Sequence, residues 1–566
     1  MPIRKIGIVS RTYRHINRYR QILTVLIKYG FDDLVDRLRI GHYLEIGLDL
    51  LTRKNHERVD RLTTPERIRK IAEELGPTFI KLGQVLSTRP DLIPADLVDE
   101  LVKLQQDVPP FPFKQVREIV ESQLERPLEE VFEQFEEQSL AAGSIGQVHR
   151  ARLRNGDEVV VKVKRPRIDE IVEVDLEILL DLATLLEKHV EEARIHRPTR
   201  IVEEFTRVIE RELDFTTEAA HLERFAALFQ SDRTLYVPKV YHDTTGPRVL
   251  TMEYVPGTPA GDVEALQAAG LDPKRIAARG AQLVLKQVFV HGFFHADPHP
   301  GNVFVLPGEV ICLLDFGMVG RIDRRGREHF ADLLLAFSAR DALRVTGALA
   351  RLTERDEDVE LDHERLERDV AEFIDIHLVT ELGRLGMGKL LRGILDLLSR
   401  HRLRIPAEMV SMLRTLATVE ALAVRLDPKL DMIAATEPYV RRLKFDRLKP
   451  TRVWRDVVDS GSELLHLARE IPGGLRDLMG QAKRGKLKIG FEHRGLESLI
   501  DTNERIANRV SFAIVCAALI VGSSLIVLSG IPPLWGEMPI IGVAGFVTAG
   551  VMGFLLLLSI IRHGRM

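Results

Sequence analysis

Two acidic residues and one amide lie close together in the middle of the chain, in the runs HADPHPGNVF and CLLDFG. Asp297 and Asn302 are five residues apart, as in the catalytic-loop pattern HRDxxxxN, where the aspartate positions or deprotonates an acceptor and the asparagine holds a metal ion. Asp315 follows an apolar run in the pattern DFG, whose aspartate binds Mg²⁺. A lone DFG is weak evidence, but both patterns at this spacing predict phosphoryl transfer.

A lysine earlier in the chain has the setting that nucleotide phosphates require. Lys162 lies in VVVKV, the place of the strand lysine in the pattern VAIK. The valines around it are expected to hold it rigidly on a sheet that faces the phosphates. The signal is weak by itself, because a lysine on an open strand face is usually solvated.

A zinc site is the alternative for the same central run. His295 and His299 flank Asp297, and their four-residue spacing is that of ligands on one helix. Pro298 and Pro300 disfavour a helix there. The nearby DFG pattern therefore favours phosphoryl transfer over zinc binding.

These residues, in this order, resemble the UbiB family of atypical protein-kinase-like proteins, which includes the mitochondrial ADCK group and supports ubiquinone biosynthesis. Three further motifs carry the resemblance: KLGQ resembles the KxGQ element of the family, AAGSIGQVH its alanine-rich loop, and ELDFTTEAAH its ExD motif. The resemblance implies an α+β, protein-kinase-like bilobal fold with an N-terminal helical KxGQ extension. It covers about residues 35 to 445, and a C-terminal hairpin also matches bacterial members.

The resemblance places nucleotide binding in the alanine-rich loop, where kinases carry GxGxxG. Backbone amides of Gly143, Ser144 and Gly146 are expected to cradle phosphate, and the two alanines that replace glycines should change the fit. The residues assigned to ATP are Ala141, Ala142, Gly143, Ser144, Ile145, Gly146, Gln147, Val148, Lys162, Glu253 and Val255.

The resemblance also assigns roles to the acidic and KxGQ residues. Glu218 is the helix acid that pairs with Lys162, while Glu212 and Asp214 meet the KxGQ helix, which folds over the site where a kinase takes its peptide. The KxGQ residues are Lys81, Gly83 and Gln84. Asp214 and Glu218 are four apart, which predicts a shared helix face. No APE motif follows Asp315, which argues against protein phosphorylation.

The elements that must position these residues can be predicted from local patterns. TTPERIRKIAEEL begins a helix with a capping threonine, within a helical region at 61–108. GQVHRARL, the dipeptide NG and EVVVKV form a strand hairpin signature. Helices are expected at 169–193 and 199–229, followed by two short strands and a mostly helical region at 262–445.

The C-terminal region contains two uncharged apolar runs, 510–528 and 540–561, each long enough to span a bilayer as a helix. A buried helical hairpin is the alternative to a transmembrane one. Small residues at Gly545, Ala549 and Gly553 can pack the hairpin or a second copy of the chain, so a homodimer stays an alternative.

Charges at the ends of this hairpin predict its orientation. Arg505 and Arg509 precede it and Arg562 and Arg565 follow it, whereas the connecting loop carries only Glu537. The positive-inside rule places both ends in the cytoplasm. We therefore expect a multi-pass protein of the bacterial inner membrane whose kinase-like part is cytoplasmic.

The segments are expected to divide as follows: 1–60 basic amphipathic helices, 61–127 KxGQ extension, 128–256 N-lobe with inserted helices, 257–445 C-lobe, 446–507 polar stalk and 508–562 transmembrane hairpin. The basic N-terminus suits a helix near anionic lipid, with a transit peptide as the alternative. The stalk is either a solvated linker or a bilayer-surface segment. The net charge of −3 argues against nucleic acid as a partner.

Together these observations predict a membrane-anchored kinase-like ATPase that uses ATP and Mg²⁺. The resemblance implies support of ubiquinone or related quinone biosynthesis, with membrane lipid, quinone precursors and other quinone-biosynthesis enzymes as partners. One alternative is a small-molecule kinase resembling aminoglycoside or choline kinases. Another is a pseudokinase scaffold, although a scaffold has no need of Lys162, Asp297, Asn302 and Asp315 together.

Overall fold

The computed structural model describes residues 8–38, 62–87, 89, 92–104, 109–190, 197–353, 362–378, 387–401, 403–447, 496–535 and 538–563. The chain divides into two compact units, Met1–Trp454 and Arg455–Met566. Parts of the predicted segments lie outside the described residues, namely 39–60 of the N-terminal segment and 448–495 of the stalk.

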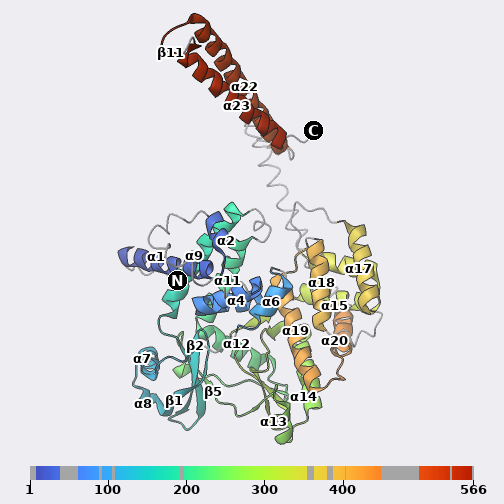
Figure 1. The fold of residues 1–566 in the computed structure, drawn as a ribbon. Helices are drawn as coiled ribbons and strands as arrows, with labels where there is room; N and C mark the ends of the chain where they lie inside the picture. Colours follow the sequence, from blue (N-terminus) through green and yellow to red (C-terminus); the bar gives the residue numbers. More distant parts are fainter. Residues whose placement is uncertain are drawn as a thin grey trace, which may run out of the picture. The chain divides into compact units, whose positions relative to one another are not determined.

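The first unit contains the predicted N-lobe sheet, an antiparallel sheet in the order β1-β2-β3-β5. Its strands are β1 (Phe132–Ala142), β2 (Gly146–Leu153), β3 (Glu158–Lys164) and β5 (Val249–Glu253). The NG dipeptide forms the β2–β3 turn with Gly156 at φ 88°, so the hairpin prediction is confirmed. Helices α7 (Phe113–Leu124) and α8 (Leu128–Val131) pack on one face of this sheet (Figure 1).

Three helices follow β3 in the chain: α9 (Ile168–His189), α11 (Pro198–Glu212) and α12 (Phe215–Leu228). The prediction of one helical run over 199–229 is wrong, because the chain breaks at Asp214. The carboxylate of Asp214 accepts the Thr216 N–H at 3.0 Å and its hydroxyl at 2.7 Å, which begins α12 as an N-cap. Asp214 therefore does not share a helix face with Glu218.

The N-terminal helices are α1 (Ile8–Lys28), α2 (Asp32–Arg37), α4 (Thr64–Leu75), α5 (Pro77–Ser87) and α6 (Ala95–Leu101). Thr63 and Glu66 form the predicted capping box at the start of α4. Ile22, Leu23 and Val25 of α1 are buried in one cluster with residues of α4, α5 and α9. This apolar face is therefore occupied by protein, in contrast to the expected contact with lipid.

The C-lobe contains a small sheet and a large helical bundle. The sheet order is β4-β9-β8-β6, from β4 (Leu235–Tyr236), β9 (Val310–Leu313), β8 (Val303–Leu306) and β6 (Thr258–Pro259), and β7 (Phe293–His295) pairs with β10 (Val319–Arg321). The helices are α13 (Val263–Ala268), α14 (Pro273–Leu285), α15 (Arg324–Ser338), α16 (Ala342–Leu352), α17 (His363–Leu378), α18 (Met387–Arg400), α19 (Ala407–Leu426) and α20 (Met432–Arg447).

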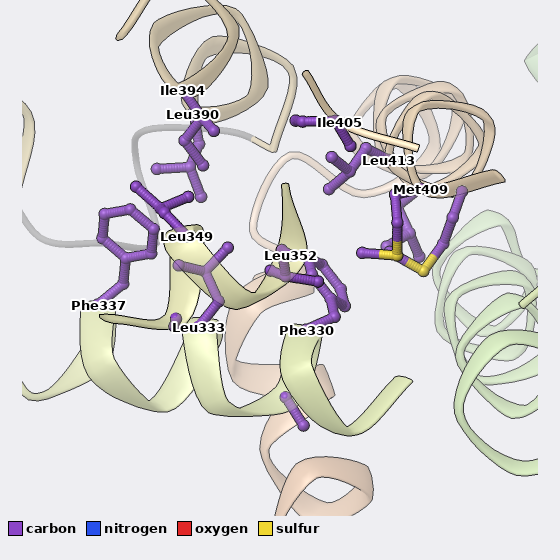
Figure 2. Packing of buried hydrophobic residues seen from close by; sticks show 14 of the residues in the cluster. Phe330, Leu333, Phe337, Leu349, Leu352, Leu390, Ile394, Ile405, Met409 and Leu413 are labelled. Atoms are coloured by element: carbon purple, nitrogen blue, oxygen red, sulfur yellow. The ribbon is translucent and has the colours of Figure 1, made fainter. Parts of the chain in front are cut away.

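An apolar core holds this bundle together. Phe330 and Phe337 of α15 meet Leu349 of α16, Ile394 of α18 and Leu413 of α19 in one buried cluster (Figure 2). The core also supports the run HADPHPGNVF, because Thr415 of α19 lies 3.4 Å from the carbonyl oxygen of Ala296 in that run. The kinase-like α+β architecture predicted from the sequence is thus present.

The second unit contains two packed helices, α22 (Leu496–Ser529) and α23 (Ile540–His563), joined through the strand pair β11 (Leu534–Trp535) and β12 (Met538–Pro539). A Cβ at Gly545 would overlap Ser523, so this glycine packs the hairpin, whereas Gly553 has open space beside it. Among the described residues one helix, Val510–Ser529, is long and apolar enough to cross a membrane, and Ile540–Phe554 is shorter. The two-span prediction is therefore unconfirmed.

A buried ion pair that joins α1 to α9 gives a stability prediction. Asp175 is fully buried, and its carboxylate accepts the Arg18 guanidinium at 2.6 and 2.9 Å, while Arg18 also donates to the Leu75 carbonyl at 2.7 Å. Arg18→Ala leaves a buried carboxylate without its cation, so we expect the free energy of unfolding to fall by about 3 kcal/mol in urea titrations. Arg152→Ala, which breaks an exposed pair, is the control and should cost less than about 1 kcal/mol. Equal losses would contradict this prediction.

Candidate functional site

A buried lysine–glutamate pair links the N-lobe sheet to α12. Val161 and Val163 flank Lys162 on β3 with their side chains fully buried, which fixes the strand and the direction of the lysine. The Lys162 Nζ lies 2.8 Å from Glu218 Oε2, as the sequence predicted. Burial by itself lowers the pKa of Lys162, but the carboxylates of Asp315 and Glu218 outweigh it and raise the pKa above its ordinary value. Burial raises the pKa of Glu218 to about 7, against the opposite effect of Lys162, so the lysine carries its charge while the glutamate titrates near neutral pH.

The DFG aspartate reaches the same lysine from the C-lobe. Asp315 Oδ1 lies 3.5 Å from Lys162 Nζ and accepts the Gly317 N–H at 3.2 Å. The Lys162 ammonium lowers the pKa of Asp315 against the opposite effect of burial, and Lys81 lowers this pKa further. Asp315 has φ 54°, a left-handed conformation that non-glycine residues adopt at a cost of about 1 kcal/mol or more. The predicted metal ligand is thus one of six non-glycine residues with a left-handed conformation in the described part of the chain.

Hydrogen bonds tie the run HADPHPGN to the DFG strand. The Asp297 N–H donates to His295 Nδ1 at 3.2 Å, so the other ring nitrogen carries the proton and donates to the Leu314 carbonyl at 3.0 Å. Asn302 Nδ2 donates to the Asp297 carbonyl at 3.2 Å. Because both nitrogens of His295 are used, this histidine is not free to ligate zinc.

The remaining oxygens fit a hard divalent cation. The amide nitrogen of Asn302 donates a hydrogen bond, so its Oδ1 remains available as an acceptor. Asp315 uses only its Oδ1 in the contacts above, so its Oδ2 remains available too. A carboxylate oxygen and an amide oxygen are ligands that Mg²⁺ accepts. The side chain of Asp297 is half-buried, with its Oδ2 4.0 Å from His299 Nε2. Hydrogen bonds from Asn302 to the Asp297 carbonyl and from the Leu314 N–H to the Asn302 carbonyl hold these three residues close together.

The alanine-rich loop forms the turn between β1 and β2. Ala141 is paired with Val148 and Ala142 with Gln147, and Gly143 donates its N–H to the Gly146 carbonyl at 2.8 Å. The amide of Gly143 is therefore already used, in contrast to its expected contact with phosphate. A Cβ at Gly146 would lie 2.6 Å from the Val163 carbonyl oxygen, so glycine is required there.

Other loop residues also face the protein. Ser144 and Ile145 are buried, and Ile145 packs in the cluster that contains Phe215. The Gln147 side chain accepts the Phe111 N–H at 2.9 Å and donates to the Phe111 carbonyl at 3.2 Å. The Gln147 side chain lies on the sheet face opposite to Lys162, so only its backbone faces the predicted nucleotide site.

A residue that sequence reasoning missed holds this loop. Arg165 Nε donates to the Gly143 carbonyl at 2.9 Å, its backbone N–H donates to the Ile145 carbonyl at 2.8 Å, and its guanidinium also reaches the Pro109 carbonyl at 2.9 Å. The position of Arg165 directly after β3, three residues beyond Lys162, was the available signal.

At the end of β5, Glu253 and Val255 follow the edge of the predicted nucleotide site. Both carboxylate oxygens of Glu253 lie 2.7 Å from the Tyr236 hydroxyl, and one accepts the Lys239 N–H at 3.2 Å. The Glu253 side chain is therefore engaged with β4 and the chain after it, and its backbone N–H donates to the Lys239 carbonyl at 2.9 Å. Val255 is half-buried.

The KxGQ and ExD motifs meet through one ion pair. Lys81 of α5 is buried and pairs with Glu212 at the end of α11, as the resemblance implied. A Cβ at Gly83 would overlap Leu104, so α5 packs closely on the end of the segment after α6. Gln84 Nε2 lies 3.5 Å from the Leu104 carbonyl. Asp214 does not join this contact, because it caps α12.

Comparison with known proteins gives matches over most of the chain. An ABC1 atypical kinase-like domain matches residues 103–349, a UbiB helical domain matches 370–431, and an ABC1/UbiB kinase-like C-terminal domain matches 494–562. A solved structure of an Rv3197–erythromycin complex from Mycobacterium tuberculosis covers 65% of this chain and 93% of its own, at 25% identity and a TM-score of 0.44.

Curated relatives extend these matches. A protein of Clostridium pasteurianum named for the hydrogenase 1 5′ region is 30% identical over 97% of this chain and 100% of its own length. A "Probable protein kinase UbiB" of Pseudomonas aeruginosa is 35% identical over 80% of this chain and 86% of its own, and one of Aeromonas salmonicida is 33% identical over 83% and 87%. The chain therefore belongs to the ABC1/UbiB family of atypical kinase-like proteins.

Proposed function

We propose that the chain is an ATP- and Mg²⁺-dependent kinase-like ATPase that is anchored in the bacterial inner membrane and supports ubiquinone biosynthesis. The observation that carries the proposal is the ion pair between Lys162 and Glu218 with Asp315 beside it. This arrangement is the one that positions nucleotide phosphates and metal in kinases. The names of the UbiB relatives support the link to a kinase-like activity.

Each residue has a distinct task in the proposed reaction. Lys162 holds nucleotide phosphates, and Glu218 keeps its ammonium in place. Asn302 and Asp315 would hold Mg²⁺, which neutralises charge on the transferred phosphoryl group. Asp297 orients water, or a small acceptor, for attack in line with the leaving group.

The KxGQ element supports hydrolysis or transfer to a small acceptor over protein phosphorylation. Lys81 pairs with Glu212 and acts electrostatically on Asp315, so α5 lies close to the proposed metal site. A peptide substrate needs room beside Asp297 that a packed helix restricts. A lipid-phase acceptor or a quinone precursor drawn from the membrane suits the apolar helix Val510–Ser529.

The carboxylate ligands give the first test of this function. Asp297→Asn and Asp315→Asn should each lower ATP turnover at least about 100-fold, because one removes the orienting base and the other a metal ligand. Phosphate release by the purified full chain with Mg²⁺, and with EDTA, measures this. Asp243→Asn changes an exposed carboxylate and should leave turnover unchanged. Turnover that survives both substitutions would favour a pseudokinase scaffold.

The Lys81–Glu212 pair gives a test of the closed KxGQ element. Lys81→Met leaves Glu212 with a buried, unpaired carboxylate, so the free energy of unfolding should fall by about 3 kcal/mol, and Lys81→Met with Glu212→Leu should recover most of it. The double variant lacks the ion pair but stays folded. We expect it to gain phosphoryl transfer to casein, measured with labelled ATP. A stable double variant that transfers nothing to casein would contradict the blocking role of α5.

Membrane coupling is tested with vesicles and in cells. Turnover by the full chain should rise several-fold with vesicles that contain a quinone-like phenol, and removal of residues 496–566 should abolish the rise. In a deletion strain, the wild-type chain should restore lipid quinone content and Asp297→Asn should not. Turnover that ignores both vesicles and phenols would argue against extraction of membrane-embedded precursors.

A further inference from the structure

A cluster of basic side chains lies outside the proposed ATP site, around the buried ring of Phe293. Arg224 of α12 places its Cζ 4.4 Å from the ring centroid, and Arg321 of β10 places its Cζ 5.5 Å from the same centroid. The His221 ring centroid is 6.1 Å from that of Phe293. Burial first, and then the charges of Arg321, Arg211 and Arg224, lower the pKa of His221, which places Arg211 in the same group.

These three arginines have no protein partner for their N–H groups in the described part of the chain. Neither a hydrogen bond nor a carboxylate ion pair joins Arg211, Arg224 or Arg321 to another described side chain, and all three are exposed. Contact with the Phe293 ring holds two guanidinium groups near each other and uses none of their N–H groups as hydrogen-bond donors. The cluster thus combines fixed orientation with uncompensated charge.

The position of the cluster connects it to the active residues. His221 lies one helical turn after Glu218 on α12, and its Nδ1 is 3.0 Å from the carbonyl oxygen of Phe316, the residue after Asp315. Phe293 begins β7, which leads to Asp297, and it is paired directly with Arg321 of β10. A ligand held here would join α12 to the strands that precede and follow the proposed metal site.

We propose that Arg224 and Arg321, with Arg211 nearby, form a binding site for a phosphate-type dianion, separate from the nucleotide phosphates. Guanidinium groups bind phosphate oxygens through paired N–H donors, and three positive charges favour a dianion over a monoanion. The carbonyl of Phe316 accepts the Nδ1 proton of His221, so the other ring nitrogen of the neutral imidazole is an acceptor and the arginines supply the donors to the dianion. A bound dianion would fix α12, and with it Glu218, against the C-lobe.

The binding test uses the full chain in detergent, with Mg²⁺ and a non-hydrolysable ATP analogue present to saturate the proposed nucleotide site. Inorganic phosphate is titrated by calorimetry, and thermal unfolding is followed in parallel. Arg224→Gln with Arg321→Gln should weaken phosphate binding at least tenfold and remove the rise in melting temperature. The matched control is Arg233→Gln with Arg325→Gln, which removes two exposed arginines elsewhere and should bind like wild type.

Two further measurements complete the test. One compares two ligands to identify the source of the dianion, and the other uses lysine variants to separate lost binding from misfolding. Monomeric dihexanoyl phosphatidate that binds more tightly than inorganic phosphate identifies a lipid headgroup, whereas preference for inorganic phosphate identifies a free ion. Arg224→Lys with Arg321→Lys keeps the charge but loses the paired donors, so its affinity should lie between those of wild type and the glutamine variant. Equal binding by all variants, or no saturable binding of either ligand, would overturn the proposal.

Discussion

The cost of burying a lysine ammonium shapes the centre of this molecule. Lys162 lies between buried valines of β3, and a buried cation is tolerated only where carboxylates compensate it. Glu218 and Asp315 supply this compensation from two different parts of the chain, α12 and the segment after β9. The need to compensate the charge of Lys162 therefore holds the N-lobe sheet, α12 and the segment after β9 close to one another. The left-handed conformation of Asp315 is maintained by the same contacts.

The KxGQ element extends this network with a second lysine. Lys81 pairs with Glu212 and lowers the pKa of Asp315, and Glu212 in turn acts on Lys162. The cluster thus contains more carboxyl groups, Glu212, Glu218 and Asp315, than ammonium groups. This imbalance favours the entry of a divalent cation at Asp315, and Glu212 Oε2 and Glu218 Oε1, which lack hydrogen-bond partners among the described residues, add to it.

Local patterns predicted most of the fold and the main site residues, and long-range packing decided the rest. The NG turn, the Thr63 cap and the order of Lys162, Glu218 and Asp315 depend on neighbouring residues or motif order, so sequence sufficed. The break at Asp214 was missed because helical periodicity continues across it. The side-chain direction of Gln147 follows from strand alternation, which lets only one of Gln147 and Val148 lie on the same face as Lys162. The clamp by Arg165 depends on where β3 ends relative to the loop, which local pattern does not specify.

The size of the acceptor follows from how α5 is attached. An ion pair alone could exchange with a substrate charge, but Gly83 also brings α5 into direct contact with Leu104, where no side chain fits between them. Opening the site to a folded protein must break a buried pair and a close packing contact together. Entry of water or of a small phenol would require neither. Under the proposed function, this closed arrangement favours hydrolysis or transfer to a small acceptor.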